Sequence, residues 1–252
     1  MRMDKSTALG MGIILFGCVA AYAESPLSFE VTADYMSKYI WRGQDFTDEP
    51  VLQPGASVTY ENLTLGIWGN LETTDVSGNS GAFTELDYYV DYSASVPGLE
   101  NLGYSVGYIY YDFPEVPATL PGVTEEVYVG LSYDTFLSPS ATVYFDIDEA
   151  DGYYVSLGIE HTVENVIGEI GADLSASLGY GDKDYNNYYW VVPSSKVNDL
   201  VVGVGFPFEV GKVSVTPSVT YIALLDNAIK ATNMYNVDNN YVVVGVGASL
   251  AF

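Results

Sequence analysis

Carboxylates at alternate positions are the residues of this sequence whose arrangement points most directly to chemistry. Glu85, Asp87 and Asp91 lie two or four residues apart, and Glu169 and Asp173 repeat that spacing. In an extended strand, residues separated in this way point to the same side. Rings of Asp and Glu concentrate cations and repel anions. The pattern therefore predicts an acidic wall suited to attracting cations.

Catalytic chemistry has little support. The one histidine, His161, has no serine two or four residues away on its face, whereas a hydrolase needs a nucleophile with a base beside it. The only cysteine, Cys18, falls in the predicted leader, so the mature chain has no thiol. We predict no catalytic residues and no enzyme, with a hydrolase that uses His161 as the distant alternative.

Metal binding has one candidate, the stretch 146–152 (DIDEADG). It resembles a calcium loop, but Ala150 stands where the third acid belongs and Leu157 replaces the closing glutamate. We predict solvated acids here, and no metal or cofactor.

The elements that would position these residues are strands. After the leader there is no sustained helical periodicity, whereas period-two alternation recurs. Within residues 102–112, for example, Leu102, Tyr104 and Val106 share one face. Most such stretches have about 9–13 residues, the length that a tilted strand needs to cross a bilayer. We predict an all-β fold, a transmembrane antiparallel up-and-down β-barrel of about 12 strands, at 27–41, 51–60, 63–71, 83–96, 102–112, 123–133, 140–148, 152–163, 168–180, 198–208, 212–222 and 240–252.

Loop lengths and aromatic residues support a membrane barrel. Connections alternate between short and long, as they do between periplasmic turns and outer loops. A soluble β-sandwich or propeller also alternates, but it needs neither this loop pattern nor aromatic belts. With directions assigned from the loops, lipid-facing aromatic residues form two belts around an apolar band. The periplasmic belt holds Phe29, Tyr60, Tyr104, Tyr133, Phe206 and Phe252, and the outer belt holds Tyr39, Trp41, Tyr88, Tyr110, Tyr153, Tyr180 and Tyr221.

The N-terminus carries an export signal. An apolar run at 8–20 is too short to span a bilayer as a helix, and Ala21-Tyr22-Ala23 offers a small-x-small cleavage pattern. We predict a cleaved signal peptide at 1–23 and one barrel domain at 24–252. An N-terminal membrane anchor and lipidation at Cys18 are the alternatives.

The C-terminus carries an assembly signal. Phe252 ends the chain, and Leu250 and Gly247 precede it at spacings that resemble the signal read by the barrel-assembly machinery. Together the two ends predict export through the periplasm to the cell outer membrane.

Net charge excludes one class of partner. The sequence has 8 Lys and Arg against 33 Asp and Glu, for a formal charge of −25. Nucleic acid needs clustered basic residues, so it is not an expected partner. A disordered acidic chain is also excluded, because such chains are poor in aromatic residues and this one has 23 tyrosines.

Four segments carry a family resemblance. Residues 37–44 (SKYIWRGQ), 51–60 (VLQPGASVTY), 65–70 (LGIWGN) and 85–93 (ELDYYVDYS) resemble, in order and spacing, a bacterial outer-membrane family labelled Gcw_chp. The resemblance covers roughly the first hundred mature residues. It implies a signal peptide and an outer-membrane barrel, and no particular substrate or reaction.

Side chains alternate between the two faces of each predicted strand. This alternation, or parity, places a set of Asp and Glu side chains inside the barrel, with two basic residues at the outer end of strand one. Tyrosines on the inner face would stack on a planar or sugar-like solute; they include Tyr89, Tyr111, Tyr128, Tyr144 and Tyr154. Two cations cannot pair with so many carboxylates, and burying unpaired carboxylates is costly. We therefore expect water or ions inside. The predicted pore-lining residues are Glu30, Asp34, Lys38, Arg42, Glu85, Asp87, Tyr89, Asp91, Glu126, Asp146, Asp148, Glu160, Glu169 and Asp173.

The function that this interior predicts is a passive channel for small hydrophilic solutes, with cations favoured. The alternative is a structural or interaction barrel without an open pore, whose outer loops at 72–82, 181–197 and 223–239 bind a partner. Lys38 and Arg42 would equally serve as structural ion pairs in a plugged barrel. The expected partners are outer-membrane lipid and lipopolysaccharide, the barrel-assembly machinery during biogenesis, and small solutes or cations.

Overall fold

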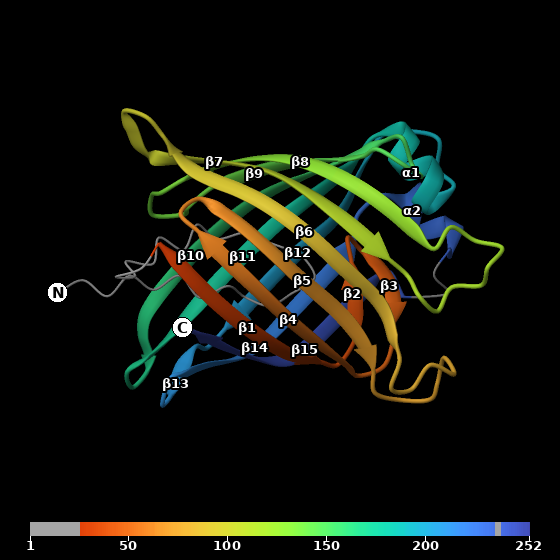
Figure 1. Ribbon diagram of the computed structural model, residues 1–252. Coiled ribbons are helices and arrows are strands. Elements are labelled where there is room, and N and C mark those ends of the chain that lie inside the picture. The colour runs from red at the N-terminus through yellow and green to blue at the C-terminus, as the bar shows by residue number, and fades with distance from the viewer. Residues whose placement is uncertain (1–25, 235–237) are drawn as a thin grey trace.

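A closed wall of twelve antiparallel strands dominates the structure, a computed structural model that describes residues 26–234 and 238–252 (Figure 1). The wall strands pair in chain order, and β1 pairs with β15 to close the ring. The predicted signal peptide, 1–23, lies outside the described residues. The wall strands are β1 (Leu27–Met36), β4 (Val51–Tyr60), β5 (Leu63–Glu72), β6 (Phe83–Val96), β7 (Leu99–Asp112), β8 (Val123–Tyr133), β9 (Ser140–Asp146), β10 (Tyr153–Ile167), β11 (Ile170–Gly181), β12 (Lys196–Gly205), β14 (Val213–Leu224) and β15 (Asn240–Ala251).

The outer surface of this wall is apolar. Val31, Leu65, Val129 and Leu157 are among the many large hydrophobic side chains that it exposes. An apolar surface of this extent suits lipid rather than water. The predicted fold class and outer-membrane location are therefore confirmed. Of the described helices, none is long and apolar enough to cross a bilayer.

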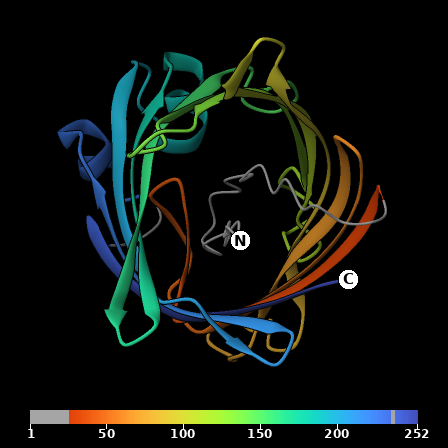
Figure 2. The same ribbon diagram turned by 90° about the vertical axis from the view of Figure 1, so that its left-hand side faces the viewer.

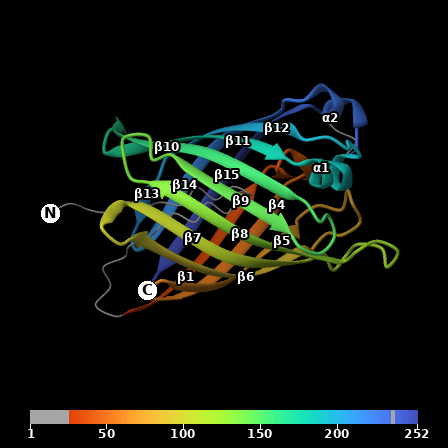
Figure 3. The ribbon, with the colours of Figure 1, turned by 90° about the horizontal axis from the view of Figure 1, so that it is seen from above.

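The two ends of the barrel differ. Both described chain ends lie at one end, together with short turns and the small strand β13 (Phe208–Val210). Two helices, α1 (Lys183–Trp190) and α2 (Asn227–Thr232), lie at the other end (Figure 3). Since outer-membrane barrels have short periplasmic turns and longer outer loops, we name these the periplasmic and outer ends.

Residues 37–50 correct the prediction for the first strand and for the outer aromatic belt. β1 ends at Met36, and the chain then folds into the barrel as a hairpin of β2 (Tyr39–Trp41) and β3 (Gln44–Thr47), visible inside the ring of strands in Figure 2. Arg42 and Gly43 form its turn with φ of 49° and 80°, the positive values that a two-residue hairpin requires. Tyr39 and Trp41 are therefore buried in the lumen and do not face lipid.

The prediction that the chain after the leader contains no helix was also wrong. Asp182 caps α1 by accepting a hydrogen bond from the Tyr185 backbone N–H, and Asp226 caps α2 from the N–H groups of Ala228 and Ile229. Helices of eight and six residues are too short to leave a periodic pattern, so local capping is their main sequence mark.

The predicted assembly residues lie at the seam between the first and last strands. Gly247 pairs with Asp34, and Leu250 pairs with Val31. Phe252 exchanges two backbone hydrogen bonds of 2.9 Å with Phe29, and their rings stack with centroids 5.9 Å apart. The C-terminal residue therefore also takes part in closing the barrel.

Candidate functional site

The inward hairpin, residues 37–50, forms the centre of the candidate site. Its two strands make a separate two-stranded sheet that is not part of the wall ladder. Residues 39–45 are all buried, although they belong to a loop between membrane strands. The wall therefore surrounds a second element in the outer half of the lumen, with a strand pairing of its own.

Contacts from this hairpin reach most of the way around the wall. Tyr39 packs on Trp68 of β5, and Trp41 packs on Tyr111 of β7. The Gly43 turn approaches β14 so closely that a Cβ atom there would lie 2.6 Å from the Leu224 side chain. Further contacts to β8, β9 and β10 come from Arg42, so the hairpin spans the lumen rather than lining one side.

Arg42 makes the central polar contact of the site. Its Nη1 and Nη2 atoms donate to the two carboxylate oxygens of Glu126 on β8, at 2.7 and 2.8 Å. Tyr111 donates a further hydrogen bond to the same carboxylate at 2.8 Å. Arg42 is 7% exposed and Glu126 is 1% exposed. A buried, bidentate pair of this kind is directional and strongly coupled, because little water screens it.

Aromatic rings enclose the same guanidinium. Its Cζ atom lies 4.3 Å from the ring centroid of Trp41, 4.4 Å from that of Tyr144 on β9, and 4.6 Å from that of Tyr154 on β10. Tyr185 of α1 lies at 5.9 Å. These distances are within the range of cation–π attraction. We call Glu126, Tyr144, Tyr154 and Tyr185 the cation cage.

Helix α1 covers the cage from the outer end. Tyr185, Tyr189 and Trp190 are buried beneath it. The Tyr189 ring lies 5.6 Å from that of Trp41, and the Tyr189 hydroxyl donates to Asp146 at 3.0 Å. The outer loop at 181–197 is thus packed onto the lumen, with its aromatic residues turned inward.

Asp45, on β3, is in an electrostatically unfavourable position, because it is buried in the lumen. Its Oδ1 atom is buried without a hydrogen-bond partner among the described residues. Burial raises the pKa of Asp45 to about 6, although the Lys38 charge lowers it. Lys38 itself pairs with Asp48 of the same hairpin. Seating the hairpin in the lumen therefore leaves a poorly solvated carboxylate.

A protein family accounts for most of the chain. Residues 20–244 match a family described as "Bacterial protein of unknown function (Gcw_chp)". The chain belongs to the Gcw_chp family. The resemblance drawn from residues 37–93 is thereby confirmed. No curated protein matches the sequence.

Solved structures similar to this Gcw_chp barrel include two outer-membrane proteins. Outer membrane phospholipase A from Escherichia coli has 13% identity over 88% of this chain and 92% of that chain, with a TM-score of 0.45. The COG4313 outer membrane channel from Pseudomonas putida F1 has 8% identity over 89% of this chain and 95% of that chain, with a TM-score of 0.47. At such identities the likeness concerns the fold alone.

The predicted pore-lining residues of the Gcw_chp barrel fall into three groups. The first group is buried. Asp91, a member of this group on β6, accepts a hydrogen bond of 2.6 Å from Tyr128. Glu30, Asp34, Tyr89 and Asp173 are partly exposed, and Glu160 is exposed. The buried group is Arg42, Glu85, Asp87, Asp91, Glu126 and Asp146.

The third group, Lys38, Asp148 and Glu169, corrects the prediction, and so does the position of Arg42 in the buried group. Lys38 and Arg42 lie on the hairpin and not on strand one. Asp148 and Glu169 are exposed outside the wall strands. The backbone N–H of Asp148 binds the Asp146 side chain at 3.1 Å, a local turn that ends β9. Gly168, with φ of 64°, makes the turn that holds Glu169.

Two residues near the cage were missed from the sequence. Asp199 of β12 accepts from the Tyr154 hydroxyl at 2.9 and 3.0 Å, and Tyr185 belongs to an unforeseen helix. Asp199 lies inside the predicted strand at 198–208. The alternation along that strand places it on the inner face and could have identified it. No comparable pattern marked Tyr185, because it lies in a loop whose short helix has no clear periodicity in the sequence.

His161 and the calcium-like stretch lie apart from this site. His161 Nδ1 lies 2.7 Å from the Phe136 carbonyl oxygen in the periplasmic half, and its ring lies against that of Phe136. Within residues 26–234 and 238–252, no group of three or more His, Cys, Asp or Glu side chains is arranged to hold a metal ion.

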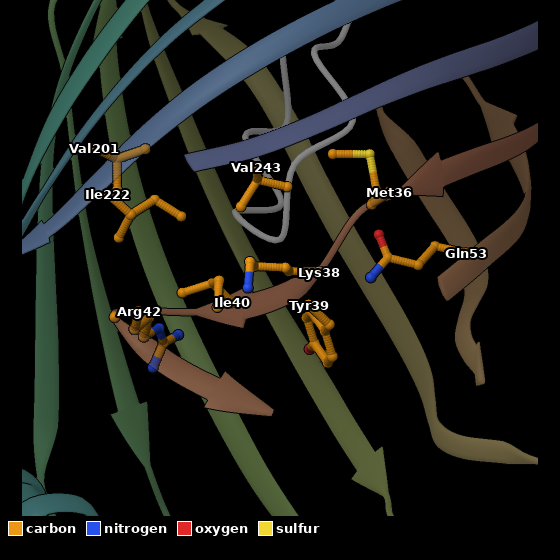
Figure 4. A pocket seen from close by; sticks show the side chains of 10 residues that line it. Met36, Lys38, Tyr39, Ile40, Arg42, Gln53, Val201, Ile222 and Val243 are labelled. Carbon is orange, nitrogen blue, oxygen red and sulfur yellow. The ribbon is translucent and has the colours of Figure 1, made fainter. Parts of the chain in front are cut away.

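Two cavities border the hairpin. The first has about 30 Å³ and lies between the hairpin and Val201, Ile222 and Val243 of the wall (Figure 4). The second has about 60 Å³ and lies beside Trp41 and Tyr189. Because one water needs about 10–15 Å³ by this measure, each of these spaces can hold only a few waters. A larger solute would not fit in either of them while the hairpin is seated.

Proposed function

We propose that this protein is a gated outer-membrane channel for small hydrophilic solutes, with a preference for cations, and that the hairpin at 37–50 is its gate. The observation that carries the proposal is the hairpin's independence from the wall ladder. A separate element can leave the lumen without breaking a hydrogen bond between wall strands.

Electrostatics support movement of this element. A buried ion pair is weak evidence for stability, since desolvating both charges offsets their attraction. The hairpin carries such a pair at Arg42 and a poorly solvated carboxylate at Asp45. The desolvation of Arg42, Glu126 and Asp45 therefore opposes the seated position of the hairpin, as expected for a gate.

Cation preference is supported by the carboxylates on the inner face of the wall. Glu85, Asp87, Asp91 and Glu126 all lie on the lumen side of β6 and β8. With Arg42 withdrawn, Glu126 would lose its basic partner from the hairpin. A narrow acidic passage of this kind favours cations.

A barrel without a pore, acting through its outer loops, is the second candidate. The filled outer half of the lumen favours it. The predicted binding loop at 181–197, however, turns Tyr185, Asn186 and Trp190 inward, which leaves fewer aromatic side chains for a partner. This observation makes the loop-binding function the weaker of the two.

The test replaces residues 38–47 by a short Gly-Ser linker and measures single-channel conductance in planar bilayers under a KCl gradient. We expect the native protein to be mostly silent, and the variant to give stable steps with a cation-selective reversal potential. A matched control replaces the exposed outer-loop residues 75–78 and should remain silent. Silence from the hairpin variant, once shown to be folded and inserted, would defeat the channel and favour the loop-binding barrel.

A further inference from the structure

The cation cage is built from the wall and from helix α1, and none of its four residues belongs to the hairpin. Glu126, Tyr144 and Tyr154 come from three successive wall strands, and Tyr185 comes from α1. Of the aromatic rings around the guanidinium, only that of Trp41 belongs to the hairpin and would move with it. If the hairpin leaves, a carboxylate and three tyrosine rings stay in place.

Further hydrogen bonds hold the cage without help from Arg42. Tyr111 of β7 donates to Glu126 at 2.8 Å, and Asp199 of β12 accepts from Tyr154. Both contacts join wall strands to one another. The carboxylate and one ring are therefore oriented in advance, which reduces the ordering cost that a ligand would face.

The cage has the chemistry of a guanidinium receptor. A planar guanidinium matches a carboxylate through two parallel N–H···O bonds and stacks on aromatic faces. Arg42 makes both interactions here, with bonds of 2.7 and 2.8 Å to Glu126 and ring centroids 4.4 and 4.6 Å from its Cζ. Its position is that of a ligand tethered to the protein.

We propose that the cage is a binding site for a small guanidinium-bearing solute, and that Arg42 occupies it as an internal ligand while the hairpin is seated. The inference deepens the proposed function and rests on it, since a solute gains access only when the hairpin moves. Such a solute competes with Arg42 for the cage. By binding only the vacated cage, it shifts the population toward the open form.

The test empties the cage with Arg42→Ala and measures binding of methylguanidinium to the folded protein in detergent by calorimetry, and by the rise in unfolding temperature. We expect binding to Arg42→Ala at least about tenfold tighter than to the double variant Arg42→Ala/Glu126→Gln, because a charge-assisted bidentate contact is lost. Sodium at equal concentration should give no such difference. Equal binding to both variants would overturn the inference.

A matched control removes a different cation. Lys196 pairs with Asp226 at 3.2 Å near the outer loops, so Lys196→Ala should gain no methylguanidinium binding. If Arg42→Ala does not fold, the same titration is made on the barrel with residues 38–47 replaced, with and without Glu126→Gln. Binding without conductance supports the cage and defeats the channel, whereas conductance without binding defeats the cage alone.

Discussion

Two glycines of the wall lie directly opposite inward-facing tyrosines of the next strand. Gly66 pairs with Tyr89, and Gly107 pairs with Tyr128. A Cβ atom on Gly66 would lie 2.1 Å from Cζ of Tyr89, and one on Gly107 would lie 2.2 Å from Cζ of Tyr128. Each glycine therefore provides the space in which a tyrosine ring lies against the wall.

Gly107→Ala should lower the free energy of unfolding by about 1–3 kcal/mol, the usual cost of overpacking. The Tyr128 ring must move, and its hydrogen bond of 2.6 Å to Asp91 breaks with it. Urea unfolding of the refolded protein in micelles measures the change. Gly122→Ala is the control, because its Cβ would meet no atom closer than 3.7 Å. Equal losses in both variants would contradict this account.

Helix α1 connects a local cap to the cover of the cage. The Asp182 side chain accepts from the backbone N–H of Tyr185 at 2.9 Å and from that of Tyr153 at 3.0 Å. One carboxylate thus starts the helix and ties it to β10. Asp182 therefore helps to place Tyr185 over the guanidinium, together with the packing of Tyr185 on Tyr154 and Tyr189.

Asp182→Ala should loosen α1, since losing an N-cap costs about 0.5–2 kcal/mol. We expect faster amide hydrogen exchange in residues 183–190, and more frequent channel openings in otherwise native protein. Asp226→Ala removes the equivalent cap of α2 and should speed exchange at 227–232 without changing conductance. Unchanged exchange in α1 would show that the cap does not hold the helix.

The wall strands were predictable because each has one face in lipid and the other inward, which imposes period two on the sequence. The same alternation led to the wrong assignment of residues 37–41 to the first wall strand. Tyr39 and Trp41 alternate there too, but the segment pairs with β3 and not with the wall. Gly43 was a partial signal for the hairpin turn, but Arg42 is not among the residues that favour its positive φ, so the pair lacks the usual Asn-Gly or Asp-Gly pattern.

The cage was only partly predictable. Parity placed Glu126, Tyr144 and Tyr154 inside the barrel, as found. It could not show that Arg42 would reach them, because Arg42 was assigned to strand one. Contacts between β8 and a hairpin 84 residues away depend on the three-dimensional path of the loop, which a strand period does not encode.

Charge is the property that acts across the whole molecule. With −25 formal charge and a lumen lined by carboxylates, an opened barrel would hold a negative potential along its length. Salt screens such a potential over about 10 Å at 0.1 M and about 3 Å at 1 M. Selectivity that comes from these charges should therefore decline as salt rises.

In the barrel with residues 38–47 replaced, Asp87→Asn together with Asp91→Asn should shift the reversal potential toward zero in dilute KCl, because two lumen charges are removed. The shift should shrink in 1 M KCl, where screening is strong. Asp75→Asn with Glu115→Gln removes the same charge from exposed outer loops and should have the smaller effect. If the loop pair matters as much as the lumen pair, selectivity arises at the mouth, and the acidic wall of the lumen does not determine which ions pass.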